Sequence, residues 1–126
     1  EGSIINFASD TGVIGSAGDG IYASSKGAIL TWTRTIAAEW GTESNVRCNN
    51  FNPIVKTPQY EQWLAHTDPA IVQQHLATLK TEFPIDGALG EVDRDIVPAV
   101  LFLSSEGSRY ITGQTICVNG GRVMVR

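Results

Sequence analysis

Three short apolar runs, separated by longer segments with helical patterns, constrain this chain more than any other feature of its sequence. The runs are "SIINFAS" at residues 3–9, "NVRCNNFNP" at 45–53 and "QTICV" at 114–118. Each is bounded by glycine, proline or a polar turn, which is typical of buried strands. Strands that alternate with helices form a parallel sheet, so the predicted fold class is α/β. With 126 residues, 42% of them hydrophobic, the chain is expected to form one domain with a modest core.

The strongest helical signal covers residues 21–40, where apolar residues recur along one helix face and Gly41 follows as the expected C-cap. Thr57-Pro58 and Asp68-Pro69 each place a capping residue before a proline. These pairs predict two short helices, over residues 58–66 and 69–81.

A last helix is expected to begin at Glu91 or Asp93 and to end at Leu103, and Pro98 costs it one backbone hydrogen bond unless it lies near the first turn. Two segments are predicted to be loops. They are residues 10–20, which contain four glycines, and residues 82–92.

Composition excludes several classes of partner. The net charge is −4 and the sequence has no basic run, so a nucleic-acid partner is not expected. No apolar stretch reaches the roughly 18–20 residues that span a bilayer, so no membrane association is expected. Cys48 and Cys117 lie far apart in predicted strands and are expected to be reduced thiols. The predicted localisation is cytoplasmic.

Tyr22 and Lys26 stand four positions apart and are therefore expected on one face of the long helix. Ser9 ends the first predicted strand, thirteen residues before Tyr22, and ligands of parallel sheets bind beyond the carboxyl ends of the strands. A nearby ammonium favours the ionised form of a tyrosine hydroxyl, and a serine hydroxyl can donate to a substrate oxygen that gains negative charge. The three residues are predicted to form a proton-transfer site, although a Tyr-x-x-x-Lys pair alone also fits plain helix packing.

Two other kinds of site are disfavoured. His66 and His75 are nine positions apart, a spacing that does not return to one helix face, so no metal site is predicted. Ser9 lies in "ASDTG" rather than in Gly-x-Ser-x-Gly, which argues against a serine hydrolase.

Four motifs occur in order along the chain: "NFASDTG", "YASSK", "NFNPIVKTP" and "GQTICVNGG". Together they resemble the short-chain dehydrogenase/reductase family, whose pattern is Ser, then Tyr-x-x-x-Lys, then Pro-Gly, then a terminal Asp-Gly-Gly. Asn119 replaces the aspartate of that pattern, and the glycine after Pro53 is absent. The resemblance implies part of a doubly wound, Rossmann-like parallel sheet. It also implies that residues 1–126 are the C-terminal half of such a domain, lacking the N-terminal half that binds the adenosine and pyrophosphate of the cofactor.

The resemblance assigns roles to single residues. It implies an NAD- or NADP-dependent oxidoreductase that interconverts an alcohol and a ketone, with Ser9, Tyr22 and Lys26 as catalytic residues. Tyr22 exchanges the proton, Ser9 orients the substrate oxygen, and Lys26 supports Tyr22 and binds the nicotinamide ribose. The segment after the second strand is implied to touch the cofactor. Its candidate residues are Pro53, Ile54, Val55 and Thr57.

Residues 58–90 match the variable substrate lid of the family, and Trp63 is expected, with Ser9 and Tyr22, to contact the substrate. Leu64, Leu79 and Phe83 are further lid candidates, although these residues also fit plain helix core. The expected partners are a small alcohol or carbonyl substrate and further copies of the chain, as a dimer or tetramer. The alternative is a non-catalytic fragment or scaffold that keeps the oligomer surfaces of the family.

Overall fold

A parallel three-stranded sheet in the order β1-β2-β3 forms the centre of the computed structural model, which describes residues 2–125. The strands are β1 (Gly2–Phe7), β2 (Val46–Pro53) and β3 (Thr115–Val118). Gly2 pairs with Val46 at one end of the β1–β2 ladder, and Pro53 pairs with Val118 at the end of the β2–β3 ladder. The α/β class and the parallel sheet predicted from the sequence are confirmed.

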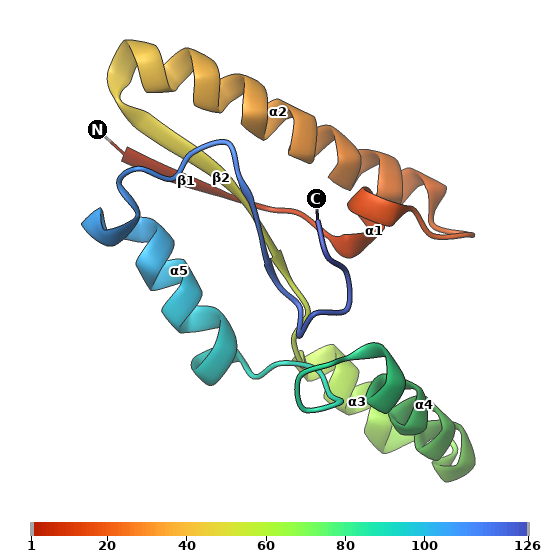
Figure 1. Cartoon of the computed structure of the whole chain (residues 1–126). Coiled ribbons are helices and arrows are strands. Elements are labelled where there is room, and N and C mark those ends of the chain that lie inside the picture. Colours follow the sequence, from red (N-terminus) through yellow and green to blue (C-terminus); the bar gives the residue numbers. More distant parts are fainter. Residues whose placement is uncertain (1, 126) are drawn as a thin grey trace.

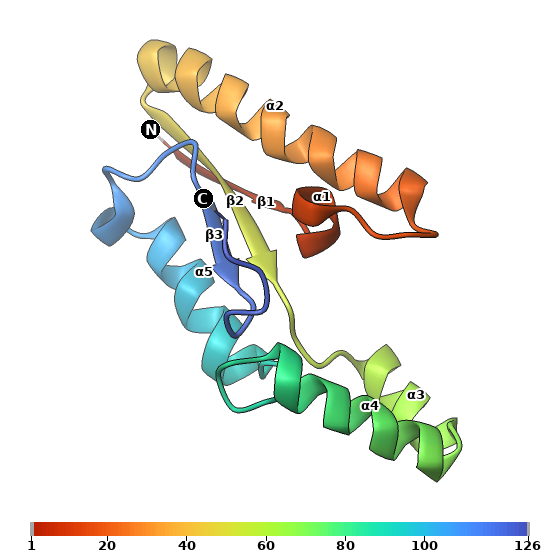
Figure 2. The same cartoon turned by 45° about the vertical axis from the view of Figure 1, so that its right-hand side comes forward.

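Helices connect and cover the strands (Figures 1 and 2). They are α1 (Asp10–Ile14), α2 (Gly20–Ser44), α3 (Pro58–His66), α4 (Pro69–Glu82), η1 (Val92–Ile96), α5 (Val97–Ser104) and η2 (Glu106–Ser108). Figure 1 shows α2 and α5 on opposite sides of the sheet. No helix among residues 2–125 is long and apolar enough to cross a membrane.

The sheet carries one small core on each face. Ile36 and Ala37 of α2 pack with Cys48, and Ile4 lies against them. On the other face, Phe51 packs with Ile96 and Leu103. Because successive strand residues point to opposite faces, Ile4 joins the first core while Ile5 joins the second.

The predicted loop over residues 10–20 is wrong in its first part, where α1 forms a short helix. Ser9 caps this helix, since its side-chain oxygen accepts a hydrogen bond from the Thr11 amide at 3.2 Å. Gly12 lies against the Lys26 backbone, so the glycine that weakens a helix in isolation allows α1 to pack against α2. β1 consequently ends at Phe7, two residues earlier than expected.

The prediction that Gly41 ends the long helix is also wrong. Helix α2 continues to Ser44 and ends at Asn45, which adopts the left-handed conformation with φ 53° and ψ 38°. The Asn45 amide donates to the Trp40 carbonyl. Asparagine tolerates this conformation better than most residues, so it serves the role expected of glycine.

Both capped helices α3 and α4 are confirmed, with Thr57 and Asp68 as their caps. The last helix differs from expectation, because it begins as the wide turn η1, in which the Val97 amide donates to the Val92 carbonyl. Pro98 is the second residue of α5, directly after the wide turn η1.

The central strand β2 buries polar side chains as well as apolar ones. Asn50 is fully buried, and its Oδ1 accepts a hydrogen bond of 2.8 Å from the Thr33 hydroxyl of α2. The same hydroxyl accepts a bond of 2.9 Å from the Asn6 amide of β1. Thr33 therefore joins α2 to two strands through groups that would be costly to bury unpaired.

Candidate functional site

Tyr22 and Lys26 lie on the first turns of α2, beside the carboxyl end of β1. The Lys26 Nζ is 5.7 Å from the centre of the Tyr22 ring. Tyr22 is 48% exposed, so the side chain is open to a ligand. The four-residue spacing thus brings the two side chains together on one helix face, as the sequence predicted.

Lys26 also ties α2 to the sheet. Its Nζ donates a hydrogen bond of 2.8 Å to the Phe7 carbonyl oxygen, at the last residue of β1. The bond fixes the ammonium at Phe7, which precedes Ser9 by two residues in the sequence. The structure therefore places Lys26 and its neighbour Tyr22 close to the end of β1, where Ser9 begins α1.

The Ser9 hydroxyl is fixed by its position at the start of α1. Its oxygen accepts the 3.2 Å bond from the Thr11 amide, and the backbone of Ser9 is extended, with φ −159° and ψ 149°. A hydroxyl that accepts one bond still has its own proton to donate. Ser9 can therefore act as a donor toward a ligand oxygen.

The predicted cofactor-binding residues in the segment after β2 lie in different environments. Pro53 ends β2, and the Ile54 amide donates to the Val118 carbonyl of β3 at 3.0 Å. Val55 forms a parallel bridge with Gly90 and packs against the core around Phe51. Its side chain is thus engaged in the core.

Thr57, the last residue of this group, is the cap of α3, since its hydroxyl oxygen accepts a bond of 3.2 Å from the Tyr60 amide. Ile54 is not among the described non-glycine residues with positive φ, which are Asn45 and Asp86. The turn therefore forms without the glycine that the family pattern has after the proline.

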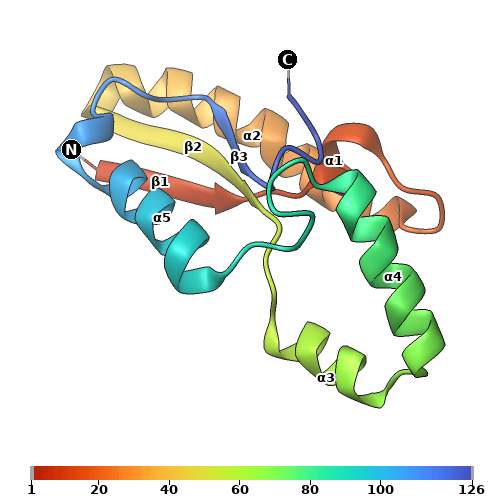
Figure 3. The same ribbon diagram turned by 60° about the horizontal axis from the view of Figure 1, so that its bottom comes forward.

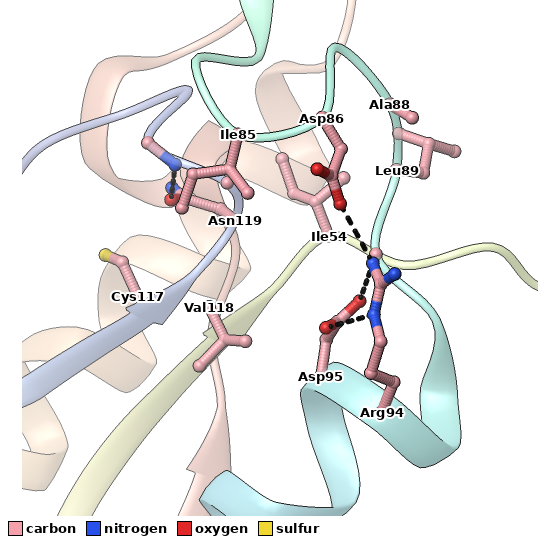
Figure 4. A pocket seen from close by; sticks show the side chains of 13 residues that line it. Ile54, Ile85, Asp86, Ala88, Leu89, Arg94, Asp95, Cys117, Val118 and Asn119 are labelled. Carbon is pink, nitrogen blue, oxygen red and sulfur yellow. Dashed lines mark hydrogen bonds and ion pairs between the residues drawn. The ribbon is translucent and has the colours of Figure 1, made fainter.

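A cavity of about 400 Å³ opens beyond the carboxyl ends of β2 and β3. Figure 4 shows the residues that line it: Ile85 lies beside Asn119, Val118 lies on β3, and Asp86, Arg94 and Asp95 lie together on the opposite side. This position agrees with the rule that ligands bind at the carboxyl ends of parallel strands. The lining does not include Ser9, Tyr22 or Lys26.

The rim of this cavity carries an ion-paired arginine. Arg94 contacts Asp95 at 2.8 Å and Asp86 at 3.1 Å (Figure 4). The hydrogen bond from Arg94, together with one from the Glu91 amide, lowers the pKa of Asp95 below its usual value. Both carboxylates engage the guanidinium, so the positive charge of Arg94 is paired with two negative charges at this rim.

Trp63 belongs to an aromatic group on α3 and α4. Its ring stacks on Tyr60 with centroids 6.1 Å apart, and it meets the His75 ring edge-on at 5.0 Å. The Tyr60 hydroxyl lies 3.0 Å from the His75 Nε2, and burial raises the pKa of Tyr60. Trp63 itself is 39% exposed, so part of its ring is open to a ligand.

The other lid candidates have separate environments. Leu64 lines a shallow groove between α3 and α4, while Leu79 and Phe83 are buried. His66 contacts the Gln62 carbonyl at 2.8 Å, on α3, whereas His75 contacts Tyr60. Figure 3 shows α3 and α4 beyond the end of β2, apart from the two helices that cover the sheet.

Comparison with known proteins identifies the family. A family model described as Enoyl-(Acyl carrier protein) reductase matches residues 1–122. The chain is 37% identical over 124 residues to a (3R)-3-hydroxyacyl-CoA dehydrogenase of Homo sapiens, covering 98% of the chain and 43% of that protein. This chain belongs to the short-chain dehydrogenase/reductase family. The chain is also 35% identical over 121 residues to a 7alpha-hydroxysteroid dehydrogenase of Bacteroides fragilis, covering 95% of the chain and 43% of the relative.

Solved structures of the family share the fold. The Cj0485 dehydrogenase superposes with a TM-score of 0.87 at 31% identity, over 99% of this chain and 47% of that one. A putative short-chain dehydrogenase/reductase from Burkholderia xenovorans gives a TM-score of 0.79 at 32% identity, over 95% and 45%. This short-chain dehydrogenase/reductase chain therefore spans less than half the length of the relatives described here.

Sequence reasoning missed one residue at this edge of the sheet. Asp10 lies in the segment predicted to be a loop, but the residue is only 3% exposed and contacts three residues from two other parts of the chain, Asn52, Asn119 and Arg122. A carboxylate next to Ser9 was the only sequence signal, and burial of such a group cannot be deduced from local sequence.

Proposed function

We propose that this chain is the C-terminal half of an oxidoreductase domain that interconverts an alcohol and a ketone with NAD or NADP. The observation that carries the proposal is the arrangement of Lys26, whose ammonium lies 5.7 Å from the Tyr22 ring centre and is fixed on the Phe7 carbonyl. The coverage of relatives, at 43% of the human dehydrogenase, supports the view that another segment completes the domain.

Tyr22 is the proposed acid and base. Its exposed hydroxyl gives a proton to a carbonyl oxygen in reduction and takes it back from an alcohol in oxidation. Lys26 places a positive charge 5.7 Å from the centre of the Tyr22 ring. Ser9 donates a hydrogen bond to the same substrate oxygen as negative charge develops on it.

The groups present fit a nicotinamide cofactor. Lys26 and Tyr22 offer donors to a ribose hydroxyl, and Ile54 and the neighbouring backbone of Pro53 and Thr57 lie at the carboxyl edge of the sheet. When bound, a nicotinamide supplies or accepts the hydride. Trp63 is the proposed apolar wall for the substrate, because its ring is partly exposed on α3.

The test is an assay of the full-length protein with NAD or NADP and three probe substrates. Two are taken from the names of the relatives above, a (3R)-3-hydroxyacyl-CoA and a 7alpha-hydroxysteroid. The third is tropinone, taken from the name of a tropinone reductase homolog of Arabidopsis thaliana that is 36% identical to this chain over 121 residues. Tyr22→Phe is expected to lower kcat by about 100-fold or more. The Kd of the cofactor should change little, because only one hydroxyl is removed. Tyr110→Phe is the matched control, since Tyr110 is 94% exposed. A Tyr22→Phe variant that keeps activity within about threefold of the parent contradicts the assignment.

Self-association is a second proposal, and it also fits a non-catalytic scaffold. Trp32 and Trp40 are 46% and 38% exposed on α2 and meet edge-on, with ring centres 6.4 Å apart. Two large aromatic side chains on one open helix face favour contact with a second copy of the chain. Sedimentation of the parent and of Trp32→Glu tests this. A parent protein that is monomeric at all concentrations contradicts the proposal.

The location proposed for the protein is the cytoplasm. The free thiols Cys48 and Cys117 support it.

A further inference from the structure

Asp10 is a buried carboxylate that joins the ends of all three strands. It follows Ser9 and lies three residues beyond Phe7, the last residue of β1. Its Oδ1 accepts hydrogen bonds from the Asn52 amide, near the end of β2, and from the Asn119 amide at 2.9 Å, just after β3. A carboxylate that is 3% exposed is tolerated in the interior only with such partners.

The network stands next to two proposed parts of the site. Asp10 adjoins Ser9, and Asn52 adjoins Pro53, where the segment proposed to meet the cofactor begins. A shift of the carboxylate therefore moves the backbone at Ser9 and at Pro53, the two segments proposed to meet the substrate and the cofactor. Because proton transfer depends on sub-ångström placement of donors, small shifts here affect turnover more than binding.

Two oxygen atoms in this network are not satisfied by hydrogen bonds. Among the described residues, Asp10 Oδ2 and Asn52 Oδ1 are the buried side-chain atoms without a hydrogen-bond partner. Buried structural networks normally satisfy such atoms, and exceptions mark functional positions or bound water. Asp10 Oδ2 faces the Arg122 guanidinium, but the distance of 3.7 Å to Nη1 exceeds that of a hydrogen bond.

Arg122 extends the network to the end of α4. Its Nε contacts Glu82 Oε2 at 3.0 Å, and its guanidinium carbon lies 5.9 Å from the centre of the buried Phe83 ring. One arginine therefore bridges the carboxylate beside Ser9 and the last residues of the helix proposed to form the lid.

We propose that Asp10 is a positioning residue that sets the Ser9 hydroxyl and the turn at Pro53, and that Arg122 couples this setting to the end of α4. The inference rests on the proposed function of Ser9. Asp10 and Arg122 act through their neighbours and do not touch the substrate.

The test compares Asp10→Asn, Arg122→Gln and their double variant in the full-length protein. Asparagine keeps the shape and the accepting oxygen but removes the charge that faces Arg122. The assay uses whichever of the three probe substrates the parent turns over fastest. Each single variant is expected to lower kcat by about tenfold or more and to leave the KM of that substrate nearly unchanged. The kcat of the double variant should be no lower than that of the less active single variant, because the two groups act as a unit. Arg122→Lys should recover part of the loss, and Asp93→Asn, which changes an exposed carboxylate, should have no effect.

A second readout does not depend on activity. The Thr11 amide, which donates to Ser9 Oγ, should shift its NMR signal in Arg122→Gln, which leaves the sequence around Thr11 unchanged, but not in Asp93→Asn. An unchanged Thr11 signal in Arg122→Gln overturns the proposal. Loss of thermal stability with an unchanged kcat at a temperature where every variant is folded also overturns it. If the parent turns over none of the probes, the proposed function fails, and the Thr11 signal in Arg122→Gln still decides whether the Asp10–Arg122 network sets the position of Ser9.

Discussion

Gly12 of α1 lies directly against Lys26 of α2. A Cβ atom at Gly12 would come within 2.7 Å of the Lys26 carbonyl carbon and 2.8 Å of its Cβ. Only the absence of a side chain at Gly12 therefore allows the helix that carries Ser9 at its start to approach the helix that carries Tyr22 and Lys26.

The first prediction follows from this contact. Gly12→Ala must push α1 away from α2, which should destabilise the fold by about 1–3 kcal/mol and lower turnover. Gly20→Ala is the control, because a Cβ at Gly20 meets nothing within 4 Å and the residue begins α2. The control should be neutral or stabilising by about 0.4–1 kcal/mol. Chemical denaturation measures both, and equal stability of the two variants contradicts the contact.

Lys26→Met tests the role of the ammonium. The variant loses the charge beside Tyr22 and the bond to the Phe7 carbonyl. We expect kcat to fall by about tenfold or more and cofactor affinity to weaken, because the charge beside Tyr22 and a donor to the cofactor are both lost. A tenfold change corresponds to about 1.4 kcal/mol of lost interaction. Lys80→Met, at an exposed position of α4, is the control. Steady-state kinetics and cofactor titration are the measurements, and normal kinetics of Lys26→Met rule out the proposed role.

Thr33→Val tests the buried polar contact between α2 and the sheet. Valine keeps the shape of threonine but leaves Asn6 and Asn50 without the hydroxyl that each of them contacts. The expected loss of unfolding free energy is about 1–3 kcal/mol. Thr31→Val changes an exposed threonine on the same helix and should change stability little. Urea denaturation compares the two, and similar midpoints refute the importance of the network.

Asp95→Asn tests the ion pairs at the rim of the cavity. Arg94 lowers the pKa of Asp95 in the folded protein, so the stabilisation is present above the ordinary carboxyl pKa of about 3.9 and is lost as the pH falls through the folded value. The parent should therefore be more stable than Asp95→Asn near neutral pH, and the difference should shrink below about pH 4. Asp93→Asn serves as the control for removing an exposed charge. Denaturation curves at several pH values give the difference in unfolding free energy between the parent and Asp95→Asn. A difference that grows as the pH falls would contradict the prediction.

Local sequence determined the features whose causes lie within a few residues. Thr57 and Asp68 cap α3 and α4 because each cap bonds an amide two or three positions ahead. Tyr22 and Lys26 share a face because a helix turn returns after about four residues. The order of strands and helices was readable in the same way, since buried strands are short apolar runs between turn residues.

Tertiary structure alone decided the features that depend on residues distant in sequence. Helix α1 exists where four glycines predicted a loop, because Gly12 packs on α2. Val55 is held by Gly90 and the core, which its position after Pro53 did not reveal. Asp10 is buried because Asn52, Asn119 and Arg122 converge on it from far along the chain. The free energy of such contacts comes from groups that the fold brings together, so no pattern within a short window of sequence can report them.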